Sequence, residues 1–180
     1  MKLFKFILAL LITVSISSCS EDPGEPTIIL SNANIAGIHG INSFNLNTKV
    51  TSETNVSGVP VPFEIATSSG YGDTFQIDFE LNENGDYTLI GQYRLNSTVT
   101  PAVGNQVSDT SILLVDDSGT YEIDTSNNTI TFTSSLDAFL SGTFNVITFN
   151  ETTIVLGQEK EEVEAPITTQ INMNISFERN

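Results

Sequence analysis

The chain has 180 residues, of which 22 are acidic and 6 are basic, and its formal net charge at pH 7 is −16. This balance excludes nucleic acid as a partner, because phosphate binding requires clustered lysine and arginine. The basic residues after residue 18 are Lys49, Arg94, Lys160 and Arg179. A single cysteine also excludes an intramolecular disulfide, so a hydrophobic core must stabilise the fold without cross-links.

The N-terminal segment predicts export from the cytoplasm. Lys2 and Lys5 form a positive end, and a largely apolar run follows at residues 6–16. That run is too short to cross about 30 Å of hydrocarbon, which takes about 20 helical residues. It is typical instead of the apolar part of a secretory signal. Residues 1–18 are therefore predicted to be a signal peptide.

The four residues "ISSC", ending at Cys19, resemble the lipobox of bacterial lipoproteins. The resemblance implies that Cys19 becomes the acylated first residue of the mature chain and attaches it to a membrane. Two or more acyl chains anchor a protein stably, since each buried methylene contributes about 0.8 kcal/mol. The alternative is an ordinary cleaved signal, which would leave Cys19 as an unpaired thiol.

Residues 19–30 predict a tether between the lipidated cysteine and the folded domain. The sequence "SEDPGEP" is acidic and contains two prolines, which favour an extended conformation. Ser20, Glu21 and Asp22 resemble the export signal of Bacteroidetes surface lipoproteins. This resemblance implies a lipid-anchored protein on the outer membrane that faces the cell exterior. The alternative is an acidic linker without targeting information.

Residues 31–180 predict a single all-β domain. At residues 74–81, four apolar side chains alternate with polar ones, the period of a half-buried strand. We expect about eight to ten antiparallel strands, with segments at 43–50, 61–67, 74–81, 86–95, 111–115, 120–124, 129–133, 142–149, 152–157 and 170–177. Turns or breaks are predicted at 82–85, 116–119, 125–128 and 158–166. A phase shift within 142–149 predicts a β-bulge, and residues 134–139 predict a helical turn.

Short strands in sequence order predict an up-and-down meander that forms either a closed barrel or a two-sheet β-sandwich. The segment from Phe75 to Leu95, the hairpin "GTFNVITFNETTIVLG" and the ending "NISFER" resemble the lipocalin-like lipoproteins of Bacteroidetes. The resemblance covers residues 43–179 and implies a lipocalin-like β-barrel. The chain has no tryptophan, and "GIHG" with His39 lies roughly where that family carries Gly-x-Trp.

Motifs that suggest catalysis or metal binding have simpler explanations. The aspartic-protease pattern at residues 117–119 occurs once, whereas the mechanism needs two carboxylates. A calcium-type loop beginning at Glu80 has Gly91 where a bidentate glutamate is required. His39 is the single histidine of the chain, which disfavours both a zinc site and a serine triad. The sequence predicts a non-enzyme without a metal ion or cofactor.

Two functional hypotheses remain. In the first, the domain binds a small apolar ligand in a cavity lined by Phe75, Phe79, Tyr87, Tyr93, Tyr121, Phe132 and Phe144. The alternative for these aromatic side chains is a packed core, because small barrels are often filled by their own residues. In the second hypothesis, the domain is a surface interaction module that binds a glycan or another envelope protein through a loop at 93–110.

Overall fold

The computed structural model describes residues 28–135 and 140–179. The predicted signal peptide, the lipidation site Cys19 and the predicted export signal at residues 20–22 lie outside these residues. Most of the predicted tether and of the predicted helical turn at 134–139 lies outside them as well. Within the described part of the chain, no helix has the length and apolar character needed to cross a membrane.

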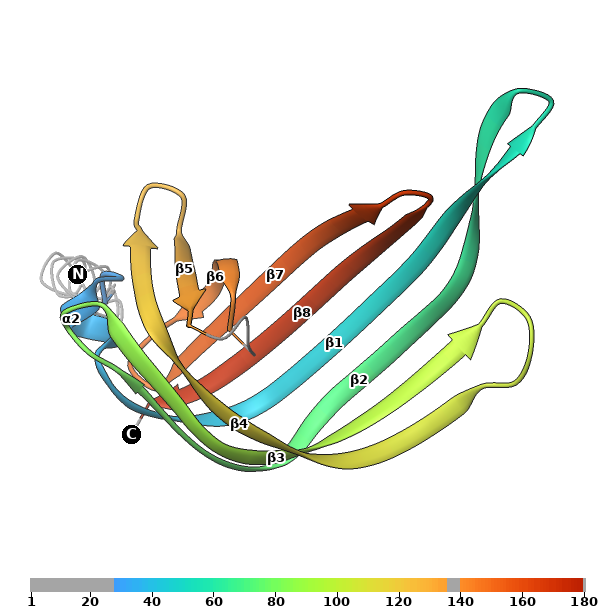
Figure 1. Ribbon diagram of the computed structural model, residues 1–180. Helices are drawn as coiled ribbons and strands as arrows, with labels where there is room; N and C mark the ends of the chain where they lie inside the picture. Colours follow the sequence, from blue (N-terminus) through green and yellow to red (C-terminus); the bar gives the residue numbers. More distant parts are fainter. Residues whose placement is uncertain (1–27, 136–139, 180) are drawn as a thin grey trace, which may run out of the picture.

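Eight antiparallel strands follow one another in a single sheet that closes into a ring (Figure 1). The strands are β1 (Gly37–Val56), β2 (Val59–Leu81), β3 (Asp86–Pro101), β4 (Val107–Asp124), β5 (Thr129–Ser134), β6 (Gly142–Phe149), β7 (Thr153–Glu164) and β8 (Ile167–Arg179). A short helix, α2 (Asn32–Ile35), precedes them. The prediction of an all-β meander is confirmed, and its single sheet is barrel-like and not a two-sheet sandwich.

The ring is uneven because its strands differ greatly in length. Strand β2 has 23 residues, whereas β5 has 6 and β6 has 8. β4 pairs with β5 only from Gly119 onward, and β6 pairs with β7 only up to Gly157. Beyond these points β7, β8, β1, β2, β3 and β4 continue together as an open sheet (Figure 1). We call the two regions the closed end and the open end.

The core lies at the closed end. Phe132 is 2% exposed and Phe144 is fully buried, and both pack against aromatic side chains from neighbouring strands. Each fully buried large apolar side chain stabilises the fold by about 1.5–3 kcal/mol relative to an exposed one. Helix α2 adds Ile35, which is 1% exposed, to this core. The closed end therefore supplies the hydrophobic stabilisation that a chain without disulfides requires.

The predicted turn at 116–119 is wrong, because β4 runs through it as one strand. The Asp117 side chain is 1% exposed and accepts hydrogen bonds from the hydroxyls of Tyr87 (3.0 Å) and Ser134 (2.7 Å). A Cβ atom at Gly119 would lie 2.0 Å from the carbonyl oxygen of Thr133, so glycine permits close strand contact here. Residues 116–119, whose sequence resembles a turn, therefore lie within a continuous strand.

Three further expectations need correction. Most of the predicted loop at 93–110 is strand, and only residues 102–106 connect β3 to β4. The acidic break at 158–166 is largely strand as well, since β7 continues to Glu164 with its charged side chains in solvent. Segments 61–67 and 74–81 both belong to β2. The turns at 82–85 and 125–128 are confirmed, as is the bulge, where the register shifts between Val146 and Thr148.

Candidate functional site

The seven aromatic residues predicted to line a cavity divide into two groups. Five of them are at most 2% exposed and belong to the core of the closed end: Phe79, Tyr87, Tyr121, Phe132 and Phe144. Phe132 lies among the others, with ring centroids 5.4 Å from Tyr87 and 5.8 Å from Phe144. The remaining two, Phe75 and Tyr93, stack on each other at 5.9 Å farther along the sheet. Their role in ligand binding stays a prediction.

His39 has a structural role at the bottom of the closed end. Its Nε2–H donates a hydrogen bond to the carbonyl oxygen of Ile35 (2.8 Å), and its ring lies 6.0 Å from that of Phe79. Burial lowers the pKa of the imidazole, and nearby Arg179 lowers it further. The Nδ1 atom has no hydrogen-bond partner among the described residues. These features describe a neutral histidine within the core.

Arg179 lies opposite His39 in the register of β8 and β1. Its guanidinium donates hydrogen bonds to the carbonyl oxygens of Asn34 and Asn150, and it lies 5.3 Å from the centre of the Phe149 ring. One cation thus joins helix α2, the β6–β7 turn and the end of β8. The closed end is covered at its base by this contact and by helix α2.

The buried polar pair Tyr87 and Asp117 is also part of the core. Burial raises the pKa of the Tyr87 hydroxyl, and the hydrogen bond to the Asp117 carboxylate raises it further. A second hydrogen bond from Tyr87 reaches the carbonyl oxygen of Leu140 (3.2 Å). Both groups therefore have partners within the fold, and Asp117 is not presented to solvent as a protease carboxylate would be.

A different candidate site lies at the open end, on the face of the sheet opposite the aromatic core. We call this side the outer face. A hollow of about 760 Å³ lies against strands β7, β8, β1, β2 and β3. Ten of its fifteen lining residues form two parallel rows across these strands, and we call this surface the polar hollow. The first row is Glu159, Asn172, Asn47, Ser69 and Thr98, and the second is Glu161, Gln170, Lys49, Thr67 and Thr100.

Some side chains of the polar hollow hold one another in place. Asn172 donates to Glu159 and Gln170 donates to Glu161, each over 3.2 Å. Lys49 forms an ion pair with Glu64 on the neighbouring strand (3.4 Å). By contrast, the side chains of Asn47, Ser69 and Thr67 make no hydrogen bond to any residue in the described part of the chain. Donors and acceptors at the middle of the hollow thus remain available to a ligand.

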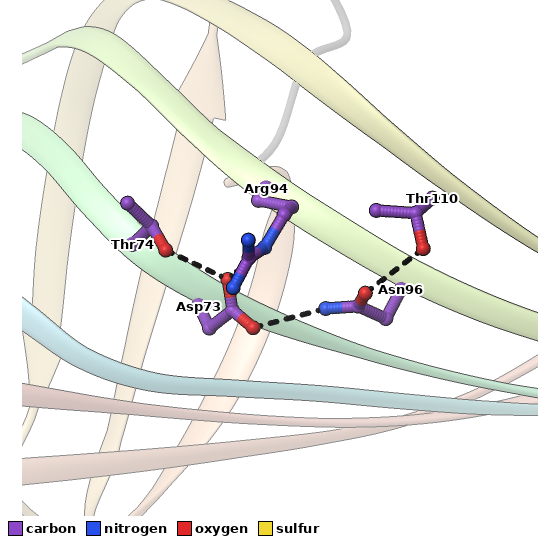
Figure 2. Close-up of polar contacts among 5 residues, drawn as sticks. All are labelled: Asp73, Thr74, Arg94, Asn96 and Thr110. Carbon is purple, nitrogen blue, oxygen red and sulfur yellow. Dashed lines mark hydrogen bonds and ion pairs between the residues drawn. The ribbon is translucent and has the colours of Figure 1, made fainter.

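A fixed polar network borders the hollow on β2, β3 and β4 (Figure 2). The carboxylate of Asp73 accepts hydrogen bonds from Arg94 (2.6 Å), Asn96 (3.1 Å) and Thr74 (2.9 Å). Thr110 in turn donates to the amide oxygen of Asn96 (3.0 Å). Hydrogen bonding to Arg94 is the main cause that lowers the pKa of the Asp73 carboxyl. The network holds Asn96 in place beside the hollow.

Tyr71 provides an exposed aromatic ring next to this network. It lies between Asn45 and Asn96 in the register, in the row adjacent to the polar hollow. Its side chain is 53% exposed, whereas the aromatic residues of the core are almost fully buried. An exposed tyrosine beside a field of amides and hydroxyls offers both an apolar ring face and a polar tip.

The polar hollow is not evident from the sequence pattern. Segments 43–50 and 170–177 were predicted as strands, but only strand register aligns their polar side chains into rows. That register depends on turn positions, and two of the predicted breaks were wrong. The available signal was the recurrence of Asn, Ser and Thr at alternate positions in several segments.

Within residues 28–135 and 140–179, no three His, Cys, Asp or Glu side chains lie close enough together to hold a metal ion. The candidate site consists of hydrogen-bonding side chains and the exposed ring of Tyr71. Comparison with known proteins adds no assignment to this geometry. No family model, curated protein or solved structure matches the chain.

Proposed function

We propose that this protein is a non-catalytic, surface-exposed lipoprotein that binds a glycan in the polar hollow on its outer face. The observation that carries the proposal is the hollow of about 760 Å³ lined by two rows of amide, hydroxyl and charged side chains. The membrane anchor in this proposal comes from the sequence, through the lipobox that ends at Cys19 and the acidic residues after it.

The side chains of the hollow match the chemistry of sugar hydroxyls. A hydroxyl both donates and accepts hydrogen bonds, and amide groups such as that of Asn47 do the same. Lys49 supplies donors, while Glu159 and Glu161 supply acceptors. Phosphate and other polyanions fit less well, because Glu159 and Glu161 balance the two lysines of the lining, Lys49 and Lys160. A neutral, hydroxyl-rich molecule is the best match.

The size and exposure of the site also favour a glycan. Pockets for small molecules are usually enclosed, apolar clefts of about 300–1,000 Å³. The hollow has a volume in that range, but it is open and its lining residues are mostly polar in type, as expected for a few sugar units of a longer chain. Tyr71 at its border provides a ring on which the apolar face of a sugar can stack.

The test is binding of the purified protein to an array of neutral and acidic oligosaccharides, followed by titration of the positive sugars. The paired variant Asn47→Ala/Asn172→Ala removes two amides from the first row. Loss of two hydrogen bonds is expected to weaken binding by about 5- to 150-fold. The matched control is Asn55→Ala, an exposed asparagine on the same strand beyond the hollow. Equal losses in both variants, or no binding to any sugar, would contradict the proposal.

The small apolar ligand remains a second prediction. Phe75 and Tyr93 stack on the inner side of the sheet, and Leu46 and Met173 are likewise partly buried against the core. These side chains lie where the closed end opens, so an apolar molecule bound there would contact them. Native mass spectrometry checks this directly: additional mass that disappears on denaturation supports a carrier.

A further inference from the structure

Three stretches of six or more strand residues at the open end have a neighbour on one side only, among the strands that the structure describes. They are residues 59–64 of β2, 107–117 of β4 and 158–164 of β7. Because β5 and β6 are short, β4 and β7 are the strands on either side of the opening in the ring. Such free edges carry unpaired backbone N–H and C=O groups, which are templates for another strand.

Two of these edges are protected by their sequence. The β2 edge contains Pro60 and Pro62, which have no N–H to donate. The β7 edge contains five charged side chains: Glu159, Lys160, Glu161, Glu162 and Glu164. Proline and charge are the usual means by which proteins prevent pairing at an edge. The β4 edge, by contrast, has no proline and fewer charged side chains than the β7 edge.

The β4 edge has the longest free stretch and the weakest protection. Residues 107–117 contain neither proline nor lysine. Ile112 and Leu114 point away from the core and are 61% and 82% exposed, respectively. Carboxylates stand near both ends of the stretch, at Asp109 and Asp116. Asp116 shares the face of Ile112 and Leu114, whereas Asp109 lies on the opposite face, so a strand of complementary pattern would carry a basic residue near each end.

The direction of the backbone groups on β4 follows from its pairing with β5. The carbonyl oxygen of Ser118 accepts a hydrogen bond from the amide of Ser135, so the backbone N–H and C=O groups of residue 118 point toward β5. In an antiparallel ladder, every second residue directs its backbone N–H and C=O groups to the same neighbouring strand. β4 has no register shift against β3, and hence Ile112 and Leu114 also direct their N–H and C=O groups to the free edge.

We propose that the free edge of β4 binds an extended segment of a partner protein in which basic residues flank apolar ones. The partner strand continues the sheet into the opening between β4 and β7. Its apolar side chains contact Ile112 and Leu114, and its basic side chains pair with Asp109 and Asp116. The acidic β7 edge on the far side of the opening favours the same positive charge.

Charge argues for a basic partner and against a second copy of this chain. After residue 18 the chain carries 4 basic and 22 acidic residues, a formal charge of −18. Two copies paired through β4 would place Asp109 and Asp116 of each copy at one seam, and that stretch contains no lysine or arginine. Like charges at close range in a sheet are destabilising. A basic segment removes this repulsion.

The test uses the full chain, purified in mild detergent, and a fluorescent peptide of defined sequence, Lys-Val-Ile-Thr-Val-Thr-Thr-Lys. Paired antiparallel with β4, this peptide places its isoleucine opposite Leu114, its second valine opposite Ile112, and its lysines opposite Asp116 and Asp109. Fluorescence anisotropy measures its dissociation constant. The control peptide has glutamate in place of both lysines, and we expect it to bind at least about tenfold more weakly.

Two variants at one position separate backbone pairing from side-chain contact. Leu114→Pro removes an N–H group that faces the free edge, and we expect it to weaken peptide binding about tenfold. Leu114→Val keeps this amide and an apolar side chain, so its affinity should stay within about twofold of the original. Asp116→Asn should bind severalfold more weakly and with a smaller dependence on salt.

Several outcomes would overturn the proposal. One is equal binding of the lysine and glutamate peptides. Another is unchanged affinity in Leu114→Pro, once its thermal unfolding shows that it is folded. If that variant does not fold, the charge tests with Asp116→Asn and the glutamate peptide decide instead. Sedimentation that shows a dimer of the original chain, but a monomer of Leu114→Pro, would assign the edge to self-association.

Discussion

The closed end and the open end share six strands but differ in how far their side chains are exposed to solvent. At the closed end, eight strands surround aromatic side chains such as Phe132 and leave them about 2% exposed or less. At the open end, β5 and β6 are absent, and the sheet presents polar rows such as the one through Asn47 and Ser69 to solvent. The buried apolar side chains are concentrated in one region, and the other exposes polar side chains to solvent.

The largest expected effect distinguishes the two regions by stability. Phe132→Ala removes a ring that contacts Tyr87, Tyr121 and Phe144, and should lower the free energy of unfolding by about 3–5 kcal/mol. Tyr71→Ala at the open end should change it by no more than about 0.5 kcal/mol. Denaturant unfolding at pH 7 measures both. Similar losses would contradict the division into two regions.

The next effect tests the point where the regions meet. Gly91 has φ +150°, and a Cβ atom there would lie 2.0 Å from the carbonyl oxygen of Gln76, beside the register shift of β2. We expect Gly91→Ala to lower the free energy of unfolding by about 1–3 kcal/mol. Gly40→Ala is the control, because its Cβ would meet nothing within 4 Å. Thermal or denaturant unfolding compares the two variants.

A third prediction concerns pH and the buried histidine of the closed end. Burial lowers the pKa of His39 in the folded state, so below its unfolded value of about 6.5 the unfolded chain binds a proton that the folded chain does not. The stability contributed by neutral His39 is complete above pH 6.5. It decreases as the pH falls, with a slope of up to about 1.4 kcal/mol per unit.

His39→Gln keeps a side-chain N–H but removes this titration, so its stability should vary less between pH 7 and pH 5. The measurement is the free energy of unfolding at several pH values, and the slopes are compared instead of the absolute stabilities. The lowered pKa of Asp73 affects stability only at more acidic pH, below its unfolded value of about 3.9. Parallel slopes for both proteins would assign the pH dependence to other groups.

The smallest expected effect is at the exposed network of the open end. Arg94 and Asp73 form an ion pair of 2.6 Å with 46% and 34% of their side chains exposed. Arg94→Gln should lower the free energy of unfolding only slightly, and the loss should shrink at high salt. Unfolding at low and high ionic strength tests this. A loss as large as that of Gly91→Ala would show that the outer face contributes more to stability than its exposure indicates.

The sequence predicts the fold class where one face of a strand is buried and the other is wet. Alternation of apolar and polar residues identified β3 and β8 well, because burial selects every second side chain there. The alternation failed around Asp117, where a turn was predicted but the chain forms a strand. The hydrogen-bond partners of Asp117, Tyr87 and Ser134, are distant in sequence. The alternation also failed at the acidic end of β7, where both faces are solvated and no alternation is needed.

The candidate site was harder to predict than the core. Asn47 and Asn172 are 125 positions apart, and they become neighbours only through the pairing of β1 with β8. Hydrophobic pattern does not determine which distant strands pair or in what register. Core residues such as Phe79 and Phe144, by contrast, can be predicted from the sequence because their side chains are large and apolar.

The contact between β1 and β8 also constrains the order in which the molecule assembles. His39 pairs with Arg179, so the ring closes only through residues that are nearly the whole domain apart. Hairpins such as β3–β4 need only local contacts and form early, whereas closing a long loop costs more entropy and slows folding. Until β8 is in place, Ile175 and Phe177 are missing from the core. The hydrophobic core of a nascent chain therefore remains incomplete until β8 has been synthesised.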